Sequence, residues 1–536
     1  MHCDLMVKGR LLTMDETRPV AAAMAVSGGR IVAVGDLADV EELRGPGTEV
    51  LDTGRRTVLP GFVEPHNHFF NDAVMLSGPL VDIRPVTLPT GDLVLARIEE
   101  EIARRGAAGA YFIGWDALLQ PGLPAVTRDW LETRSPHPLV ILHNSGHIVY
   151  FNDAARRLAR LPDDIADPVG GHFGRTPDGR LDGRAFETPA VEMITYTLFE
   201  PVLSAGVVAA ARSACGRAAA AGVTTTTELS FDGRTRDRLQ AVIDAGALTT
   251  RLRLYETARS AAEGTVAPGT GDDLCRQIGV KVWADGSPWS GNIAASFPYL
   301  GSRICDLLGI EPGHRAAPNY EAEELRELVG QFVRDGWQLA CHANGDVAAD
   351  LALTAFEPLI ADVTDHRTRL EHCSGMRADQ FRRAHALGVT CSMFPGHVRY
   401  WGDQVEDAFG DEVAERWAPI ADACASGMRV TLHNDSPVTP VSPIGNIATA
   451  VSRRTRSGRL LGPGQSIPLH TALRAHTVDA AWQVRAEDVV GSLTPGKYAD
   501  FAVLDRDIEE TAVEEIVETT VIATFLEGAV IHDRTA

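Results

Sequence analysis

Through the middle of the chain, short apolar runs of strand length alternate with longer segments rich in Ala, Arg and Glu. The clearest helices are predicted over residues 203–221 and 321–335, and each ends close to a glycine, a common helix stop. Alternation of strands and helices on this scale favours an α/β fold built as a parallel barrel. The predicted strands are Thr57–Val63, Leu139–His143, Thr224–Leu229, Ile278–Trp283, Gln338–His342, Thr368–His372, Thr390–Phe394 and Arg429–His433.

Both ends of the chain show a different pattern, in which short apolar strands are separated by glycine-containing turns. We therefore predict that residues 1–58 and 488–536 pair into a small composite β-sandwich domain. Residues 59–487 would then form a distorted (β/α)8 TIM-like barrel. Within it, residues 79–198 are too long for one strand-helix unit and predict an inserted lobe near the mouth of the barrel.

Composition narrows the class of protein. The chain has 536 residues, 45% of them hydrophobic, which is ample for a large core. Asp and Glu (72) outnumber Lys and Arg (50), and the formal charge of −22 disfavours a nucleic-acid partner. No signal-peptide pattern is evident, no apolar stretch approaches the ~18 residues of a membrane helix, and the eight cysteines form no CxxC pair. We expect a cytoplasmic protein with reduced thiols and no membrane or nucleic-acid partner.

Several predicted strands end on a residue that can bind a metal ion. His66 and His68 follow the first strand, and side chains two residues apart in an extended segment project from the same face. His342, His372 and Asp435 end or follow three later strands. Because the carboxyl ends of barrel strands form the catalytic face of this fold, these side chains are predicted to gather at one metal site.

A lysine, Lys281, lies inside the otherwise apolar strand Ile278–Trp283. A free ammonium group is costly to bury, so this lysine needs either an oppositely charged partner or a covalent modification. Pairing with a carboxylate such as Asp285 is one solution. Carboxylation by CO2 is the other, because it converts the amine into a carbamate anion that can bridge two metal ions.

In these motifs the chain resembles the amidohydrolase superfamily, specifically the YtcJ-like and N-substituted formamide deformylase-like metal-dependent hydrolases of the amidohydrolase 3 type. The resemblance spans nearly the whole chain and implies a distorted (β/α)8 barrel with a composite terminal β-sandwich. At Glu64, Glu228 and Asn434 the chain departs from the residues common in this family, but none of these differences removes a predicted ligand. The segments that carry it are 59–68 (LPGFVEPHNH), 146–152 (GHIVYFN), 221–225 (AGVTT), 280–287 (VKVWADGS), 342–346 (HANGD), 371–373 (EHC), 434–438 (NDSPV) and 496–500 (GKYAD).

The resemblance implies a binuclear centre. His66, His68 and Asp435 would hold the more buried ion, His342 and His372 the more exposed one, and a carbamate on Lys281 would bridge both. Zinc is the default for these donors, although manganese, iron or cobalt would also suit them. Two divalent ions would activate water and polarise a substrate carbonyl, which is the chemistry of hydrolysis at C–N or C–O bonds. Asp435 would be the catalytic residue, acting first as general base and then as general acid.

Other residues are predicted to face the substrate. The resemblance places His147 and Asn152 on a substrate-side loop, and His397 and Trp401 follow a predicted strand. Asp285 could orient Lys281 or His68 from behind. The alternative for each histidine is an ordinary loop residue, and aromatic residues near barrel ends often only pack. The aromatic residues that could form an acyl or amine pocket are Trp115, Trp283, Trp289, Phe394 and Trp401.

The function expected from these motifs is cleavage of an amide, N-formyl or related C–N bond of a small molecule. A deaminase or a lactone or ester hydrolase on the same barrel is the nearest alternative enzyme. A non-catalytic scaffold relative is a third possibility, which missing ligands would favour, yet all six predicted positions are filled. A homo-oligomer remains possible because the superfamily often assembles.

Overall fold

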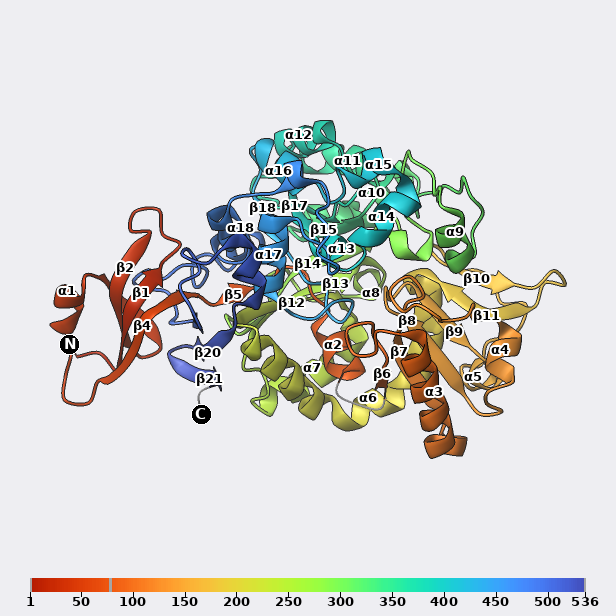
Figure 1. Ribbon diagram of the computed structural model, residues 1–536, viewed down its shortest axis with the longest axis horizontal. Coiled ribbons are helices and arrows are strands. Elements are labelled where there is room, and N and C mark those ends of the chain that lie inside the picture. Colours follow the sequence, from red (N-terminus) through yellow and green to blue (C-terminus); the bar gives the residue numbers. More distant parts are fainter. Residues whose placement is uncertain (1, 77–79, 535–536) are drawn as a thin grey trace.

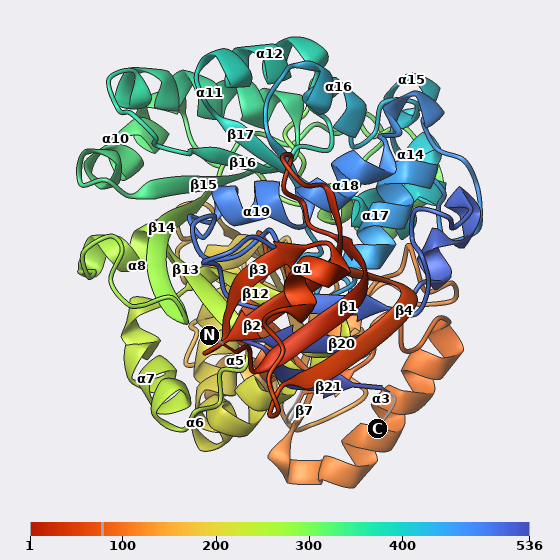
Figure 2. The same ribbon diagram turned by 90° about the vertical axis from the view of Figure 1, so that its left-hand side faces the viewer.

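The structure is a computed structural model that describes residues 2–76 and 80–534. Three β-sheets divide the molecule (Figure 1), with a sheet of terminal strands at one end, a parallel sheet flanked by helices in the middle and a smaller sheet at the other end. Seen from the terminal end, the strands of the first sheet lie in front of the ring of helices (Figure 2). Among the described residues, no helix combines the length and the hydrophobicity that crossing a bilayer requires.

The middle sheet contains eight parallel strands in the order β18-β17-β16-β15-β14-β13-β12-β5. Its two outer strands approach each other beyond their ends, where the backbone N–H of Asp435 donates to the carbonyl of His66 at 3.3 Å. The sheet is therefore curled like a TIM-type barrel, as predicted. Its strands are β5 (Phe62–Val63), β12 (Val223–Phe231), β13 (Arg251–Thr257), β14 (Cys275–Trp283), β15 (Gln338–Ala343), β16 (Arg369–His372), β17 (Thr390–Met393) and β18 (Val430–Leu432).

One predicted barrel strand is wrong. Leu139–His143 is a strand, β8, but it lies in the smaller sheet, and β13 takes its place in the barrel. The pattern hid β13 because Arg251 and Arg253 interrupt its apolar residues. Both arginines are nevertheless buried, since Arg251 pairs with Asp500 and Arg253 donates to the backbone carbonyl of Asp273.

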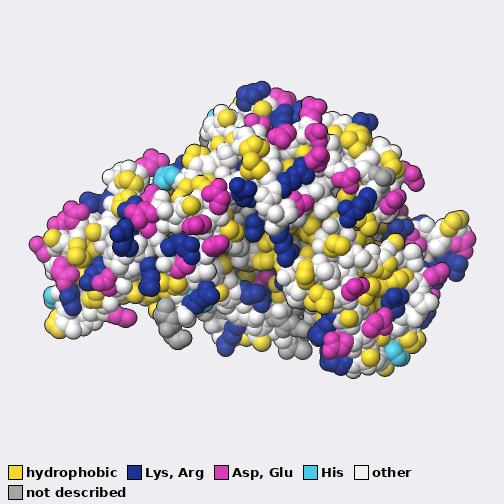
Figure 3. Space-filling model, in the orientation of Figure 1, with side chains coloured by type: hydrophobic (Ala, Val, Ile, Leu, Met, Phe, Trp, Pro, Cys, Tyr) yellow, Lys and Arg dark blue, Asp and Glu magenta, His cyan; other side chains and the backbone are white. Residues whose placement is uncertain are grey.

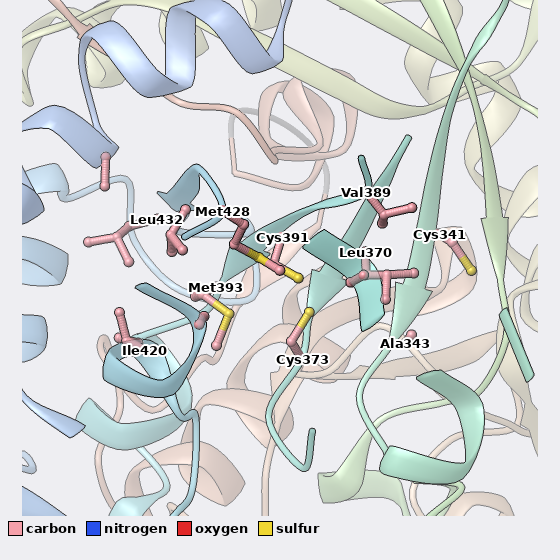
Figure 4. Close-up of a cluster of buried hydrophobic side chains, with 14 of the residues drawn as sticks. Cys341, Ala343, Leu370, Cys373, Val389, Cys391, Met393, Ile420, Met428 and Leu432 are labelled. Atoms are coloured by element: carbon pink, nitrogen blue, oxygen red, sulfur yellow. The ribbon is translucent and has the colours of Figure 1, made fainter. Parts of the chain in front are cut away.

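The core of the barrel lies between its strands and the surrounding helices. Successive strand residues point to opposite faces, so Cys341, Leu370, Cys391 and Leu432 pack outward against helices (Figure 4). The helices include α10 (Ala322–Arg334), α11 (Asp346–Ile360) and α12 (Ala378–Ala386). All eight cysteines are free. The alternate strand residues are left to face the interior, where the candidate site lies.

Strands from both ends of the chain join one seven-stranded sheet in the order β21-β20-β19-β4-β1-β2-β3. Its central contact is antiparallel pairing of β19 with β4, in which Phe501 is opposite Pro60. A composite terminal unit is thus present, while its arrangement as a two-layer sandwich stays a prediction. The strands are β1 (Leu5–Leu12), β2 (Val20–Ser27), β3 (Arg30–Gly35), β4 (Glu49–Pro60), β19 (Phe501–Leu504), β20 (Val521–Leu526) and β21 (Ala529–Asp533).

The terminal sheet leads directly into the barrel through Gly61, the only residue between β4 and β5. A Cβ at this position would lie 2.1 Å from the Thr224 hydroxyl oxygen on β12, so glycine is required for the close approach. This connection fixes the start of the segment that carries His66 and His68.

The smaller sheet lies within the range predicted as an inserted lobe. It has the order β10-β11-β9-β8-β7-β6 and is covered by α3 (Gly91–Arg105). On the molecular face of Figure 3, acidic and basic side chains are interspersed rather than gathered into a basic stripe. The strands are β6 (Val81–Asp82), β7 (Ala110–Trp115), β8 (Leu139–His143), β9 (Ile148–Phe151), β10 (His172–Arg175) and β11 (Leu181–Phe186).

Candidate metal centre and its cavity

A cavity of about 260 Å³ lies at the carboxyl ends of the barrel strands, between the barrel and the lobe. The lobe contributes the turn after β8, and the long helix α6 (Glu187–Ala220) contributes its first turns. All six metal ligands predicted from the sequence line this cavity: His66, His68, Lys281, His342, His372 and Asp435. We call it the main cavity.

Three of these residues converge on one point. The Oδ1 atom of Asp435 lies 3.3 Å from Nε2 of His66 and 3.3 Å from Nε2 of His68. This oxygen is buried and has no hydrogen-bond partner. Despite burial, the imidazoles of His66 and His68 hold the pKa of the Asp435 carboxyl well below its usual range, so it is ionised. An ionised oxygen that faces two imidazole nitrogens without a hydrogen bond is what a cation site presents when its donors are in place.

The backbone is bent at two of the predicted ligands. His372 (φ 70°) and Asp435 (φ 57°) are in the left-handed region, which residues with a Cβ rarely adopt. His372 is the last residue of the buried strand β16 and Asp435 follows the buried strand β18, and the bend directs each side chain into the cavity. Such strain persists only where the surrounding structure enforces it, and it concentrates at functional sites.

Behind the centre, the orientation of His66 is fixed by a buried ion pair. Its Nδ1 lies 2.6 Å from Oε2 of Glu371, and Arg369 donates to the same carboxylate at 2.8 Å. Against the cost of burial, the guanidinium of Arg369 holds the pKa of Glu371 well below its usual range. A carboxylate on Nδ1 leaves Nε2 of His66 as the atom that faces the cavity, an arrangement common behind metal-binding histidines.

His68 is supported in the same way by different residues. Its Nδ1 lies 2.9 Å from the Ser230 hydroxyl, which donates to Oε1 of Glu228 at 2.9 Å. Burial disfavours a charged imidazole, yet the nearby carboxylates of Asp435 and Glu228 raise the pKa of His68 to about 9. The carboxylates around this histidine therefore favour positive charge at the centre.

Lys281 extends from β14 into the same space, with Nζ 3.4 Å from Nε2 of His66. Burial lowers the pKa of the Lys281 amine to about 8. Lys281 does not pair with Asp285, the alternative to carboxylation, because the oxygens of Asp285 accept the backbone N–H groups of Asn344 and Gly345 at 2.9 Å. Asp285 also does not orient His68. Its nearest imidazole is that of His342, at 3.5 Å.

The remaining predicted ligands, His372 and His342, lie beside this group. The donor atoms of His372 converge with those of His66 and His433, and Nδ1 of His372 is 3.1 Å from Nε2 of His433. His342 packs with its ring 4.5 Å from that of His372, but its Nε2 faces Asn344 Nδ2 at 3.0 Å. Among the described residues, its nitrogens join neither of the two converging groups.

Of His147, Asn152 and His397, the polar residues predicted to face the substrate, only one lines the main cavity. His147 does so, with Nδ1 2.6 Å from Oε2 of Glu187. Asn152 has a structural role instead, since it caps the short helix α5 (Asp153–Leu158) and donates from Nδ2 to the carbonyls of Ser135 and His137. Asn152 therefore stabilises the fold of the lobe, and its side-chain amide does not line the main cavity.

Three of the tryptophans predicted to form an aromatic pocket do not line the main cavity. Trp289 and Trp401 stack on each other at 5.6 Å in a buried cluster, and Trp115 packs against Trp130 within the lobe. His397 belongs to the same buried cluster, where its Nδ1 bonds the Ser374 hydroxyl at 2.7 Å. Phe394 is fully buried as well. Their size made them candidates, but these rings fill the core beside the site, and of the predicted aromatic residues Trp283 is the one that lines the cavity.

Sequence reasoning missed four residues that the structure brings to the site: Glu228, Glu371, Glu187 and His433. Two of them, Glu371 and His433, could have been found from the sequence. Arg369 and Glu371 point to one face of a strand with no other charged residue, which predicts a buried ion pair. His433 stands two residues before Asp435, the same spacing that singled out His66 and His68.

Comparison with known proteins agrees with this geometry. The sequence model of the amidohydrolase family matches residues 49–532. The N-substituted formamide deformylase of Arthrobacter pascens is 27% identical over 565 residues, covering 99% of each chain. The YtcJ protein of Bacillus subtilis strain 168 is 23% identical over 544 residues, covering 98% of each chain. Among solved structures, a metal-dependent hydrolase from Pyrococcus horikoshii OT3 has a TM-score of 0.72 at 22% identity, covering 98% of this chain and 100% of that one. Because the family model spans most of the chain, this protein belongs to the amidohydrolase family.

Proposed function

We propose that this protein is a metal-dependent hydrolase that cleaves an amide, N-formyl or related C–N bond of a small molecule. The observation that carries the proposal is the buried, unpartnered Oδ1 of Asp435, held 3.3 Å from Nε2 of both His66 and His68. Membership of the amidohydrolase family and the activity named for the Arthrobacter pascens relative support the choice of a C–N bond.

The donors fit a divalent cation. Bonds of about 2.0–2.2 Å from one ion to imidazole and carboxylate donors place neighbouring donors about 3.3 Å apart at tetrahedral angles. Two imidazoles and a carboxylate suit zinc, and they also suit manganese, iron or cobalt. His66, His68 and Asp435 would hold this ion, which would supply Lewis-acid polarisation and activation of water when bound.

A second ion is proposed beside the first. His372 and His433 bring further imidazole nitrogens next to His66, and His342 lies against His372. Lys281 reaches the same space, and among the described residues no carboxylate is within ion-pairing distance of its amine. A carbamate on this lysine would supply the negative charge that a pair of divalent ions needs.

The protein side chains divide the remaining work. Glu371 and Glu228 orient His66 and His68 from behind. Asp435 would accept a proton from the attacking water on its carboxylate and return it to the leaving nitrogen. The cavity of about 260 Å³ suits a small molecule.

Metal analysis and product analysis together test this function. Purified protein should contain close to two divalent ions per chain, lose activity with a chelator and regain it when metal is returned. His68→Ala should lower the metal content, whereas His172→Ala, which removes an exposed histidine of the lobe, should not. A carboxylate and an amine should accumulate as products. An active preparation without metal would overturn the proposal, and release of ammonia would point to the deaminase alternative.

A further inference from the structure

A second cavity, of about 410 Å³, lies next to the main cavity. It sits between the first turn of α6, the short helix α8 (Ala258–Glu263) and β14. We call it the side cavity. Its wall is largely apolar and includes Val169, Pro189, Ala258, Ala262, Tyr320 and Leu328.

The two cavities share part of their walls. Thr188, Glu192, Lys281 and Trp283 line both of them. Lys281 also contacts His66, and its Nζ lies 5.2 Å from the centre of the Trp283 ring. The boundary between the cavities therefore includes Lys281 of the candidate metal centre, and a molecule whose reacting bond lies beside this residue has room on both sides.

The charged residues around the two cavities differ. Apart from the shared Glu192 and Lys281, the side cavity is lined by the carboxylates of Glu187 and Glu263 and by one guanidinium, that of Arg259. Apart from the shared residues and from Glu228 and Asp435 at the candidate metal centre, the main cavity is lined by two guanidinium groups, of Arg234 and Arg238, and by one carboxylate, that of Asp232. The side cavity is thus the one better suited to a cation.

The main cavity also has an apolar wall of its own. Val74 on α2 (Phe69–Met75), Ile113 and Leu142 from the lobe and Val207 on α6 line it away from the shared residues. Both cavities can therefore accept an apolar chain, and the difference between them is one of charge.

We propose that the side cavity binds the nitrogen-bearing arm of the substrate and the main cavity its acyl arm, so that the protein acts on amides with an apolar group on each side of the bond. This inference rests on the proposed function. Water adds its oxygen to the carbonyl carbon, the C–N bond breaks, and the nitrogen receives a proton. At neutral pH the products are a carboxylate and an alkylammonium ion, and each forms on the side whose charges suit it.

Two isomeric probes test the assignment of the arms. N-hexylformamide and N-methylhexanamide contain the same atoms, but they carry the long chain on opposite sides of the scissile bond. The measured quantity is the ratio of kcat/KM for N-hexylformamide to kcat/KM for N-methylhexanamide. This ratio cancels any change in metal content or in the fraction of active protein, because both substrates report on the same preparation.

One variant narrows each cavity. Ala262→Trp fills the side cavity from its outer end and should lower the ratio at least about 10-fold, since loss of room for one or more methylenes has effects of this size. Val74→Trp fills the main cavity and should raise the ratio by a similar factor. An unchanged ratio in both variants, or the opposite pattern, would overturn the proposal.

Calorimetry gives a readout that does not depend on turnover. Hexylammonium should bind the metal-loaded protein, and Ala262→Trp should weaken its binding at least about 10-fold relative to hexanoate, with the reverse for Val74→Trp. If the unmodified protein hydrolyses no amide, the proposed function fails, while the calorimetric ratio still decides which cavity takes which arm. Equal weakening of both ligands in both variants would contradict the assignment.

Discussion

Two clusters of buried charged residues lie at opposite ends of the barrel strands, and they differ in completeness. At the amino end of β13, Arg251 pairs with Asp500 at 2.8 Å and with Glu527 at 2.9 Å, so its charge is matched by the protein. At the carboxyl end of β18, Asp435 keeps an oxygen without a hydrogen bond. The charges of the first cluster are matched within the protein, whereas the second cluster leaves an oxygen that the proposed cation would bind. A buried charge pair supports the fold when it is satisfied and indicates a site when it is not.

The strongest way to break this comparison is Asp435→Asn. The amide keeps the shape and one oxygen donor but cannot take a proton. Because loss of a general acid-base typically costs ~10²–10⁴-fold in rate, kcat should fall by that factor while KM changes little. Steady-state kinetics on an amide substrate, with metal analysis of the same sample, measures this. Near-normal kcat with a raised KM would make Asp435 a positioning residue only.

At the other end of the barrel, Arg251→Ala should affect stability and not chemistry. It leaves the buried carboxylate of Asp500 without its cation, and breaking such a pair costs about 3–5 kcal/mol. Denaturant unfolding should show this loss, while kcat/KM of the folded protein at 25 °C stays within about twofold, since Arg251 lies outside both cavities. A loss of unfolding free energy below about 1 kcal/mol would contradict the contrast.

Asn152→Ala tests whether this residue belongs to the candidate site or only stabilises the fold. The Asn152 side chain accepts from the backbone of Leu139 and Ala155 and donates to two carbonyls. Its removal should cost about 1–3 kcal/mol of unfolding free energy, because buried backbone groups lose their partners. Metal content and KM should be those of the unmodified protein. A raised KM with an unchanged unfolding free energy would instead indicate that Asn152 contacts the substrate.

The smallest effect is expected for Arg55→Ala. Arg55 pairs with Glu510 on the surface of the terminal sheet, where the two side chains are 85% and 64% exposed. Solvent screens such a pair, so unfolding free energy should change by no more than about 0.5 kcal/mol. This variant is the matched control for Arg251→Ala. A comparable loss in both would show that burial is not what distinguishes the two pairs.

The barrel could be predicted, and six candidate ligands could be located at or near its strands, because both depend on local sequence patterns. An apolar strand that ends in His or Asp can be recognised from the sequence alone. All six predicted ligands line one cavity. β13 was missed because buried arginines look exposed until their partners are known, and Asp500 is far away in sequence. The partner of a charged side chain is a tertiary property that periodicity does not carry.

The residues around the ligands were harder to predict for a related reason. Trp289 and Trp401 are residues of a type that often lines binding pockets. Whether such a ring lines a cavity or fills the core depends on the elements that pack beside it. Trp401 turns away because its Nε1 donates to Asp116, a lobe residue. His147 faces the cavity because Glu187, at the start of α6, holds it there. Neither contact is local in the sequence.

The junction between the first and last barrel strands also has a consequence for when the protein becomes active. The backbone of Asn434 donates to Glu64 across 370 residues of chain. During synthesis His66 and His68 are added before seven of the eight barrel strands, and Asp435 is added only after all eight strands have been made. The three donors can therefore meet only after residue 435 has been made. A ribosome that stops before this point releases a fragment with two of the three donors, so the proposed metal centre cannot form on it.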